Sequence, residues 1–182
     1  RLTQESMSPA LDAAMRRTDD FLFDRTAQGA EDVELTALRD LRRARAQVSQ
    51  VFQERLAHGF SLLRVAPGPR TDKPELSLLS EEALEEQLAT EQMAEGLFRQ
   101  HATSLELLDQ RLAMVAGRTV LAGRENPVSP AHIAECFRRG LGSVELSTSV
   151  RITLCKFFER ELGPALTRLY DRLNAMLSEA GV

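Results

Sequence analysis

The sequence predicts an all-α fold: an irregular multi-helix bundle of six or seven helices, with one long helix in the N-terminal half. Apolar residues recur at three- and four-residue steps along most of the 182 residues, which is the period of an amphipathic helix. Ser-Pro pairs and isolated glycines separate these stretches, as helix starts and ends do. Hydrophobic residues make up 43% of the chain and charged residues 27%, which is typical of a globular protein.

The first predicted helix begins at Ser8, because a serine hydroxyl can cap a helix and Pro9 suits the first helical position. Residues 1–7 are predicted to be frayed, and the helix is expected to end near Gly29. Its apolar face consists of Leu11, Met15 and Leu22.

A long helix is predicted from about residue 31 to residue 64. Its apolar stripe consists of Leu38, Leu41, Ala44, Val48, Phe52, Leu56, Phe60 and Leu63. At a rise of about 1.5 Å per residue, such a helix would be about 50 Å long. We therefore expect it either to break near His58 and Gly59 or to project towards a partner. The stripe lacks the regular heptads of a coiled coil.

A segment rich in proline and glycine, residues 65–75, is predicted to divide the chain. Residues 65–74 contain three Pro and one Gly, which is typical of a linker or an exposed loop. The expected organisation is therefore an N-terminal helical pair over residues 1–64, this linker, and a C-terminal helical bundle over residues 76–182.

The C-terminal bundle is predicted to open at Ser80 with a helix that ends near Gly117. The T-x-x-E pattern from Thr103 to Glu106 predicts a bend or a restart near Ala102. The apolar side of the first half consists of Leu84, Leu88, Met93, Leu97 and Phe98. Further helices are expected over about residues 129–140, 147–162 and 164–181, where Gly163-Pro164 separates the last two.

Composition and charge exclude several classes of protein. The net charge is −4 and the pI is near 5.5, whereas a nucleic-acid-binding domain of this size is usually basic, so no nucleic-acid partner is predicted. No apolar run approaches the ~18 residues of a membrane-spanning helix, so no membrane partner is predicted. Cys136 and Cys155 are too few for a disulfide framework and are interpreted as buried free thiols, which indicates a cytoplasmic location.

The sequence contains only weak candidates for catalytic or metal-binding motifs. His132 and Cys136 share a helix face at the spacing of two zinc ligands, but no second pair completes a site, so no metal or other cofactor is predicted. Seven Glu and no Lys or Arg lie between Glu75 and Glu95, and we interpret them as a solvated helix face rather than as paired catalytic carboxylates. No Gly-rich phosphate loop is present. The chain is therefore predicted not to be an enzyme.

Two groups of residues are candidates for binding. Arg39, Arg42 and Arg43 fall on one face of the long helix, where they could hold a phosphate group or an acidic surface such as the Glu-rich helix start. The favoured alternative is surface ion pairing with Asp40 and nearby Glu, which contributes little. The apolar cluster around Phe21 and Phe23 is the second candidate, as a docking surface for a protein partner or for a second copy of the chain.

The chain resembles a large proteobacterial family of long helical proteins that is catalogued as a domain of unknown function. The resemblance is carried by L-S-L-L-S-E-E-A-L-E-E from residue 76, R-L-A at 111–113, N-P-V-S-P at 126–130, A-E-C-F-R-R at 134–139 and the closing K-F-F-E-R-E-L-G-P-A-L-T-R-L-Y-D-R-L-N-A-M-L-S-E-A-G-V. It implies that the chain is an excerpt of a longer protein. Some members of the family carry a downstream PilZ-type domain, the fold that binds cyclic di-GMP, and some are labelled thymidine phosphorylase.

Residues and resemblance together predict a non-catalytic protein-interaction or regulatory module of a larger cytoplasmic bacterial protein, with a link to cyclic di-GMP signalling. The partner is expected to dock on the stripe of the long helix or on the Phe21–Phe23 cluster. One alternative is a ligand-sensing domain that binds a phosphorylated small molecule through Arg42 and Arg43. A second, less favoured, is a nucleoside phosphorylase.

Overall fold

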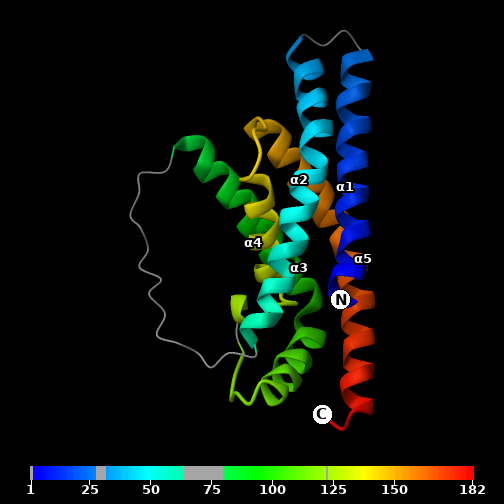
Figure 1. Cartoon of the computed structure of the whole chain (residues 1–182), viewed down its shortest axis with the longest axis vertical. Coiled ribbons are helices and arrows are strands. Elements are labelled where there is room, and N and C mark those ends of the chain that lie inside the picture. Colours follow the sequence, from blue (N-terminus) through cyan, green and yellow to red (C-terminus); the bar gives the residue numbers. More distant parts are fainter. Residues whose placement is uncertain (1, 28–31, 64–79, 122) are drawn as a thin grey trace.

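The computed structural model of the chain describes residues 2–27, 32–63, 80–121 and 123–182, all of which are helices or connections between helices (Figure 1). The elements are α1 Leu2–Ala27, α2 Asp32–Leu63, α3 Glu81–Val115, the short 3-10 helix η1 Gly123–Glu125, α4 Pro130–Leu141 and α5 Thr148–Glu179. The all-α prediction is confirmed. The predicted number of six or seven helices is wrong, because the described residues form five α-helices.

The five α-helices form a closed ring of neighbours. α1 packs against α2 and α5, α2 also packs against α4, and α3 closes the ring between α4 and α5. α1 and α2 lie side by side along the long axis of the molecule, and the beginning of α3 extends outwards at its margin (Figure 1). No helix among the described ranges is long and apolar enough to cross a membrane.

An aromatic cluster fixes the centre of the ring. The ring of Phe158 on α5 stacks on Phe137 of α4 with the centroids 4.4 Å apart, and it meets Phe52 of α2 edge-on at 5.7 Å. All three side chains are fully buried. Aromatic pairs of this kind contribute about 0.5–1.5 kcal/mol beyond their buried area, so three helices that are distant in sequence are held at one point.

The long helix α2 neither breaks nor projects. It runs unbroken from Asp32 to Leu63, and six positions of its predicted stripe, from Leu38 to Leu56, are buried against its neighbours. Gly59 is a site of close approach rather than a hinge, since a Cβ atom there would lie 2.7 Å from Cε1 of His132 on α4. The expected docking on the α2 stripe is therefore wrong, because the stripe forms part of the core.

The first helix begins earlier than predicted. α1 starts at Leu2, and Thr3 and Met7 are buried, so the prediction of a frayed segment before residue 8 is wrong for the described residues. The hydroxyl of Ser8 donates to the carbonyl of Gln4 at 2.7 Å instead of capping a helix start.

Two predicted interruptions are absent, and these account for the lower helix count. α3 continues through Ala102 and changes direction along its length without a break (Figure 1). α5 continues through Gly163 and Pro164. Pro164 and Pro9 both lie inside helices at exposed positions, and Arg160 and Glu5, whose backbone carbonyls they leave without a helical donor, are exposed residues as well.

The predicted helix starts at Ser80 and Ser129 are confirmed. The hydroxyl of Ser80 accepts from the backbone N–H of Ala83 at 3.2 Å, and that of Ser129 accepts from His132 at 3.1 Å. Ser147 is the N-cap of α5 by its backbone position, without a side-chain capping bond. The predicted linker, residues 65–75, lies outside the described residues, as does Gly29.

Candidate functional site

The first half of α3 has two apolar faces. Met93 and Leu97 are buried against the core, whereas Leu84, Leu88 and Phe98 are 47%, 46% and 52% exposed. At about 100° per residue, these three exposed side chains fall within about 80° of arc on the opposite side of the helix. A helix that faces water on one side normally carries polar residues there. The second apolar stripe of α3 is therefore expected to be covered by another segment or by a partner.

The same half of α3 is strongly acidic. Its glutamates are Glu81, Glu82, Glu85, Glu86, Glu91 and Glu95, and the first basic residue of the helix is Arg99. Glu86 forms an ion pair with Arg151 at 3.0 Å, and Glu91 accepts from the amide of Gln87 at 2.9 Å. The exposed face therefore combines an apolar stripe with carboxylates that are largely unpaired within the described parts of the chain.

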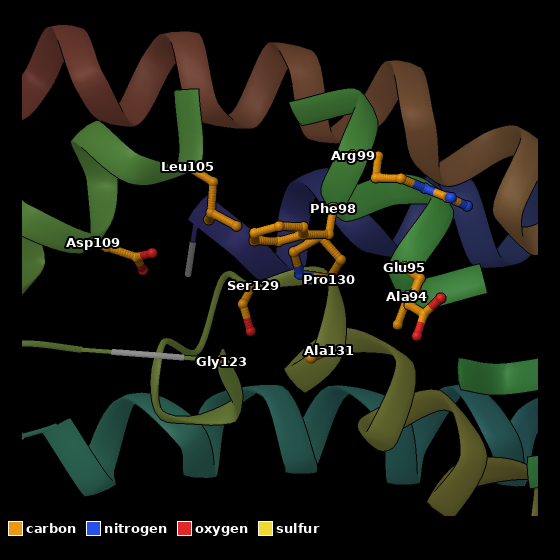
Figure 2. Close-up of a pocket in the computed structure, with 10 residues that line it drawn as sticks. All are labelled: Ala94, Glu95, Phe98, Arg99, Leu105, Asp109, Gly123, Ser129, Pro130 and Ala131. Atoms are coloured by element: carbon orange, nitrogen blue, oxygen red, sulfur yellow. The ribbon is translucent and has the colours of Figure 1, made fainter. Parts of the chain in front are cut away.

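A pocket of about 300 Å³ lies between α3 and the start of α4 (Figure 2). Its walls are Ala94, Glu95, Phe98, Arg99, Leu105, Asp109, Gly123, Ser129, Pro130 and Ala131. A second hollow of about 170 Å³ shares Ala94 and Ala131 with it and continues towards Glu135 and Arg138. We call the two hollows together the α3–α4 groove.

A buried polar network supports one end of the groove. The side-chain amide of Asn126 donates to Asp109 Oδ1 at 2.6 Å, and Asn126 Oδ1 accepts from the N–H of Val128 at 2.9 Å. The hydroxyl of Tyr170 donates to the carbonyl of Val128 at 2.7 Å. All five residues of the N-P-V-S-P segment, 126–130, are buried, so the loop before α4 is a fixed part of the wall.

Asp109 is a partly buried titratable group in the wall of the pocket, whereas Glu95 and Arg99 are exposed. Figure 2 shows its carboxylate pointing into the pocket from one end, the ring of Phe98 near Pro130 in the middle, and Glu95 and Arg99 at the other end. Burial raises the pKa of Asp109, and the hydrogen bond from Asn126 offsets part of that effect. Its second carboxylate oxygen accepts no hydrogen bond from the described residues.

Comparison with known protein families assigns the chain. The model described as "Protein of unknown function (DUF1631) N-terminal domain" matches residues 1–181. The chain belongs to this family. The match confirms the resemblance to a family of unknown function, whereas a PilZ-type partner domain and phosphorylase activity stay predictions. Comparisons with curated proteins and with solved structures gave no match.

The predicted arginine face of this DUF1631 domain is partly used inside the fold. Arg42 binds Asp19 of α1 through two hydrogen bonds, Nε to Oδ1 at 2.6 Å and Nη2 to Oδ2 at 2.8 Å. The hydrogen bond from Arg42 lowers the pKa of Asp19. Arg42 therefore links α2 to α1 and does not contact the acidic start of α3. Arg39 and Arg43 form no ion pair with the described residues.

The surroundings of Arg43 do not favour a phosphate ligand. Arg43 lines a hollow of about 400 Å³ beside the connection between α4 and α5, and Asp40 and Glu145 line the same hollow. Two carboxylates beside one guanidinium leave an environment that repels an anion.

The predicted Phe21–Phe23 cluster lies on α1, outside the α3–α4 groove. Phe21 is 39% exposed and meets Phe157 of α5 edge-on with centroids 6.1 Å apart, while the guanidinium of Arg25 lies 5.8 Å from its ring centroid. Phe23 is 56% exposed. Phe21 is thus partly used in packing, and Phe23 remains an exposed apolar side chain.

The two thiols are buried, and His132 and Cys136, which share a helix face at the spacing of two zinc ligands, have no further ligand beside them among the residues that the structure describes. Burial raises the pKa of Cys136 to about 12 and that of Cys155 to about 11, the opposite of what a thiolate nucleophile needs. The described ranges contain no group of three or more His, Cys, Asp or Glu side chains placed to hold a metal ion. His132 Nδ1 lies 3.2 Å from the carbonyl oxygen of Arg124.

Sequence patterns alone did not indicate the groove. Asp109 lies in a regular helical stretch, and the N-P-V-S-P segment is typical of a loop followed by a helix start. One indication was present, because the predicted apolar residues of α3 fall on two opposite sides of the helix. A helix with apolar residues on two opposite sides needs a neighbour on each side, whereas an ordinary amphipathic helix needs a neighbour on one side only.

Proposed function

We propose that this domain is a non-catalytic protein-interaction module that binds a helical segment of a partner protein in the α3–α4 groove. The observation that supports this most is the second apolar face of α3, formed by Leu84, Leu88 and Phe98, of which Phe98 lines a pocket of about 300 Å³. Exposed apolar surface next to a pocket is characteristic of protein-binding sites. An amphipathic helix in a groove between two helices is a recurring mode of recognition.

The walls of the groove suit a helix. Ala94 of α3 faces Ala131 and Ala134 of α4 across the groove, and these small side chains allow a third helix to approach closely. Phe98 lines the groove and is large enough to insert between the side chains of that helix. The occupant we propose is therefore an amphipathic helix whose apolar face lies on α3.

As a regulatory module of a larger cytoplasmic bacterial protein, the domain would act through occupancy of this groove. The groove replaces the α2 stripe as the docking surface, since that stripe is buried in the core. A link to cyclic di-GMP would then lie in other parts of such a protein, because the carboxylates beside Arg43 disfavour a phosphate there.

Two phenylalanines of similar exposure provide a matched test. A displayed library of amphipathic helical peptides would be selected against the chain, and the affinity of the selected peptides would be measured for the variants Phe98→Glu and Phe23→Glu. We expect Phe98→Glu to weaken binding by at least about tenfold and Phe23→Glu to leave it unchanged. Both side chains are more than half exposed, so both variants are expected to fold.

Three outcomes would contradict the proposal. Selection that yields no binding peptide would overturn it. Loss of binding only in Phe23→Glu would assign docking to the Phe21–Phe23 cluster instead. Self-association of the chain, measured by sedimentation and abolished by Phe98→Glu, would assign the groove to a second copy rather than to a partner.

A further inference from the structure

We infer that the helix bound in the α3–α4 groove is basic, and that one of its lysine or arginine side chains enters the pocket to meet the carboxylate of Asp109. This inference rests on the proposed function and names the chemistry of the partner. It assigns Asp109 as a specificity-determining residue of the groove.

The charges around the groove favour a cation at the Asp109 end. Glu95 and Arg99 lie at the opposite end of the pocket, four residues apart on α3, so the basic residue among the pocket walls is at that end (Figure 2). No basic residue lines the Asp109 end of the pocket. Asp109 is thus the carboxylate of the pocket without a cation beside it.

The two walls of the groove differ in charge, and the α4 wall carries more cations than carboxylates. Glu135 accepts from Arg138 at 2.8 and 2.9 Å and from Arg139 at 2.8 Å, so two cations of α4 share one carboxylate. Arg124 also lines this part of the groove. Opposite them, Glu91 lines the groove on α3, and the helix carries six glutamates before its first basic residue. Along α3, an acidic helix would meet repulsion and a basic helix would meet attraction, so the basic face of the bound helix is expected to lie on the α3 side.

The pocket matches the shape of a long cationic side chain. Phe98, Leu105 and Pro130 form apolar walls that suit the methylene stem of lysine or arginine. The free oxygen of Asp109 can accept a charge-assisted hydrogen bond at the end of that stem, while Asn126 holds the other oxygen in place. The ring of Phe98 adds a surface on which a guanidinium can stack.

The raised pKa of Asp109 supports the same conclusion. Burial disfavours the ionised carboxylate, and one neutral amide donor compensates it only in part. A cation of the bound helix would stabilise the ionised carboxylate further, so binding is expected to lower the pKa of Asp109. The affinity is then expected to rise as Asp109 ionises.

Three synthetic peptides of equal length, with one apolar stripe in common, test the charge. Their polar positions carry Lys and Arg in the first peptide, Gln in the second and Glu in the third. Affinities would be measured by fluorescence anisotropy for the wild-type chain, for Asp109→Asn and for the control Asp20→Asn. Asp109→Asn keeps an oxygen acceptor for Asn126. Asp20 is an exposed carboxylate on α1, so the control removes the same net charge from another helix.

We expect the basic peptide to bind at least about tenfold more tightly than the neutral one, and the acidic peptide to bind most weakly. Asp109→Asn should weaken the basic peptide by about tenfold, whereas Asp20→Asn should change its affinity by less than about twofold. Equal losses in both variants would show attraction by net charge alone and would overturn the inference.

The failure of this inference and that of the proposed function give different results. If the neutral peptide binds as tightly as the basic one and Phe98→Glu still abolishes its binding, the groove is a docking site without charge selection, and only the inference is overturned. If no peptide shows binding that depends on Phe98, the docking site itself is overturned.

Discussion

α2 and the first half of α3 differ in what covers their apolar residues. The stripe of α2 from Leu38 to Leu56 is enclosed by neighbouring helices, and Arg42 on its exposed side is paired with Asp19. α3 buries one apolar face and leaves a second one exposed beside a pocket, with carboxylates that are mostly unpaired.

This difference teaches that the length of a stripe does not identify a docking surface. α2 has the longer stripe, and the stripe from Leu38 to Leu56 is used to build the ring of helices, although Val33, Leu35 and Leu62 near the helix ends are exposed. α3 carries more apolar residues than one buried face requires, and the surplus is what a partner can use. The number of apolar faces on a helix is thus a better indicator of binding than their regularity.

The sharpest way to test the comparison is to truncate one phenylalanine on each helix. Phe52→Ala on α2 removes a fully buried ring that touches Phe158, and we expect the free energy of unfolding to fall by about 3–5 kcal/mol. Phe98→Ala on α3 removes a ring that is 52% exposed, and the expected change is within about 0.5 kcal/mol. Urea unfolding of both variants measures the difference. Similar losses in the two variants would mean that Phe98 belongs to the core, which would remove the basis for a groove.

A smaller effect is expected where α2 and α4 approach each other. Gly59→Ala would bring a Cβ atom within 2.7 Å of Cε1 of His132 and 3.2 Å of Pro127 Cβ. We expect a net loss of about 1–2 kcal/mol, because the strain exceeds the gain in helix propensity from alanine. The control Gly142→Ala makes only ordinary contacts, at 3.5 Å and beyond. The loss should disappear in a His132→Ala background, and an equal loss there would show that His132 does not set the spacing of the two helices.

Local sequence patterns predicted the fold class and most of the core, but not the helix count. The period of the apolar residues placed Leu41, Val48 and Phe158 correctly inside, since burial follows directly from that period. Gly163-Pro164 was interpreted as a break because proline removes a backbone donor. The helix continues there because the proline ring is exposed, and Leu162 and Leu166 on either side are anchored in the core.

The site was less predictable than the fold, because it depends on contacts between distant segments. Asp109 and Asn126 are 17 residues apart, and no local rule indicates that the loop before α4 returns to α3 to join them. The arginine cluster was conspicuous in the sequence, yet Arg42 has its partner 23 residues earlier on α1. Side chains that stand out by charge are often used within the fold, and those that bind a partner can look ordinary.

The smallest expected effect concerns two carboxylates whose pKa values shift in opposite directions. Arg42 lowers the pKa of Asp19, so this pair stabilises the fold above the pKa of the unfolded chain, and the contribution is lost as the pH falls through the pKa of the folded state. Burial raises the pKa of Asp109, so the unfolded chain ionises there first, and ionisation destabilises the fold as the pH rises.

The variants Asp19→Asn and Asp109→Asn should therefore show opposite pH profiles in urea unfolding between about pH 3 and pH 7. Relative to the wild type, Asp19→Asn should become less stable as the pH rises, and Asp109→Asn should become more stable. If both variants changed in stability with pH in the same direction, the negative charge of Asp109 would be compensated in the fold as fully as that of Asp19. Opposite profiles would show that Asp19 of α1 and Arg42 of α2 compensate each other within the fold, whereas α3 holds the carboxylate of Asp109 at a cost in stability. Such a cost is expected where a residue is retained for a ligand that the folded chain alone does not supply.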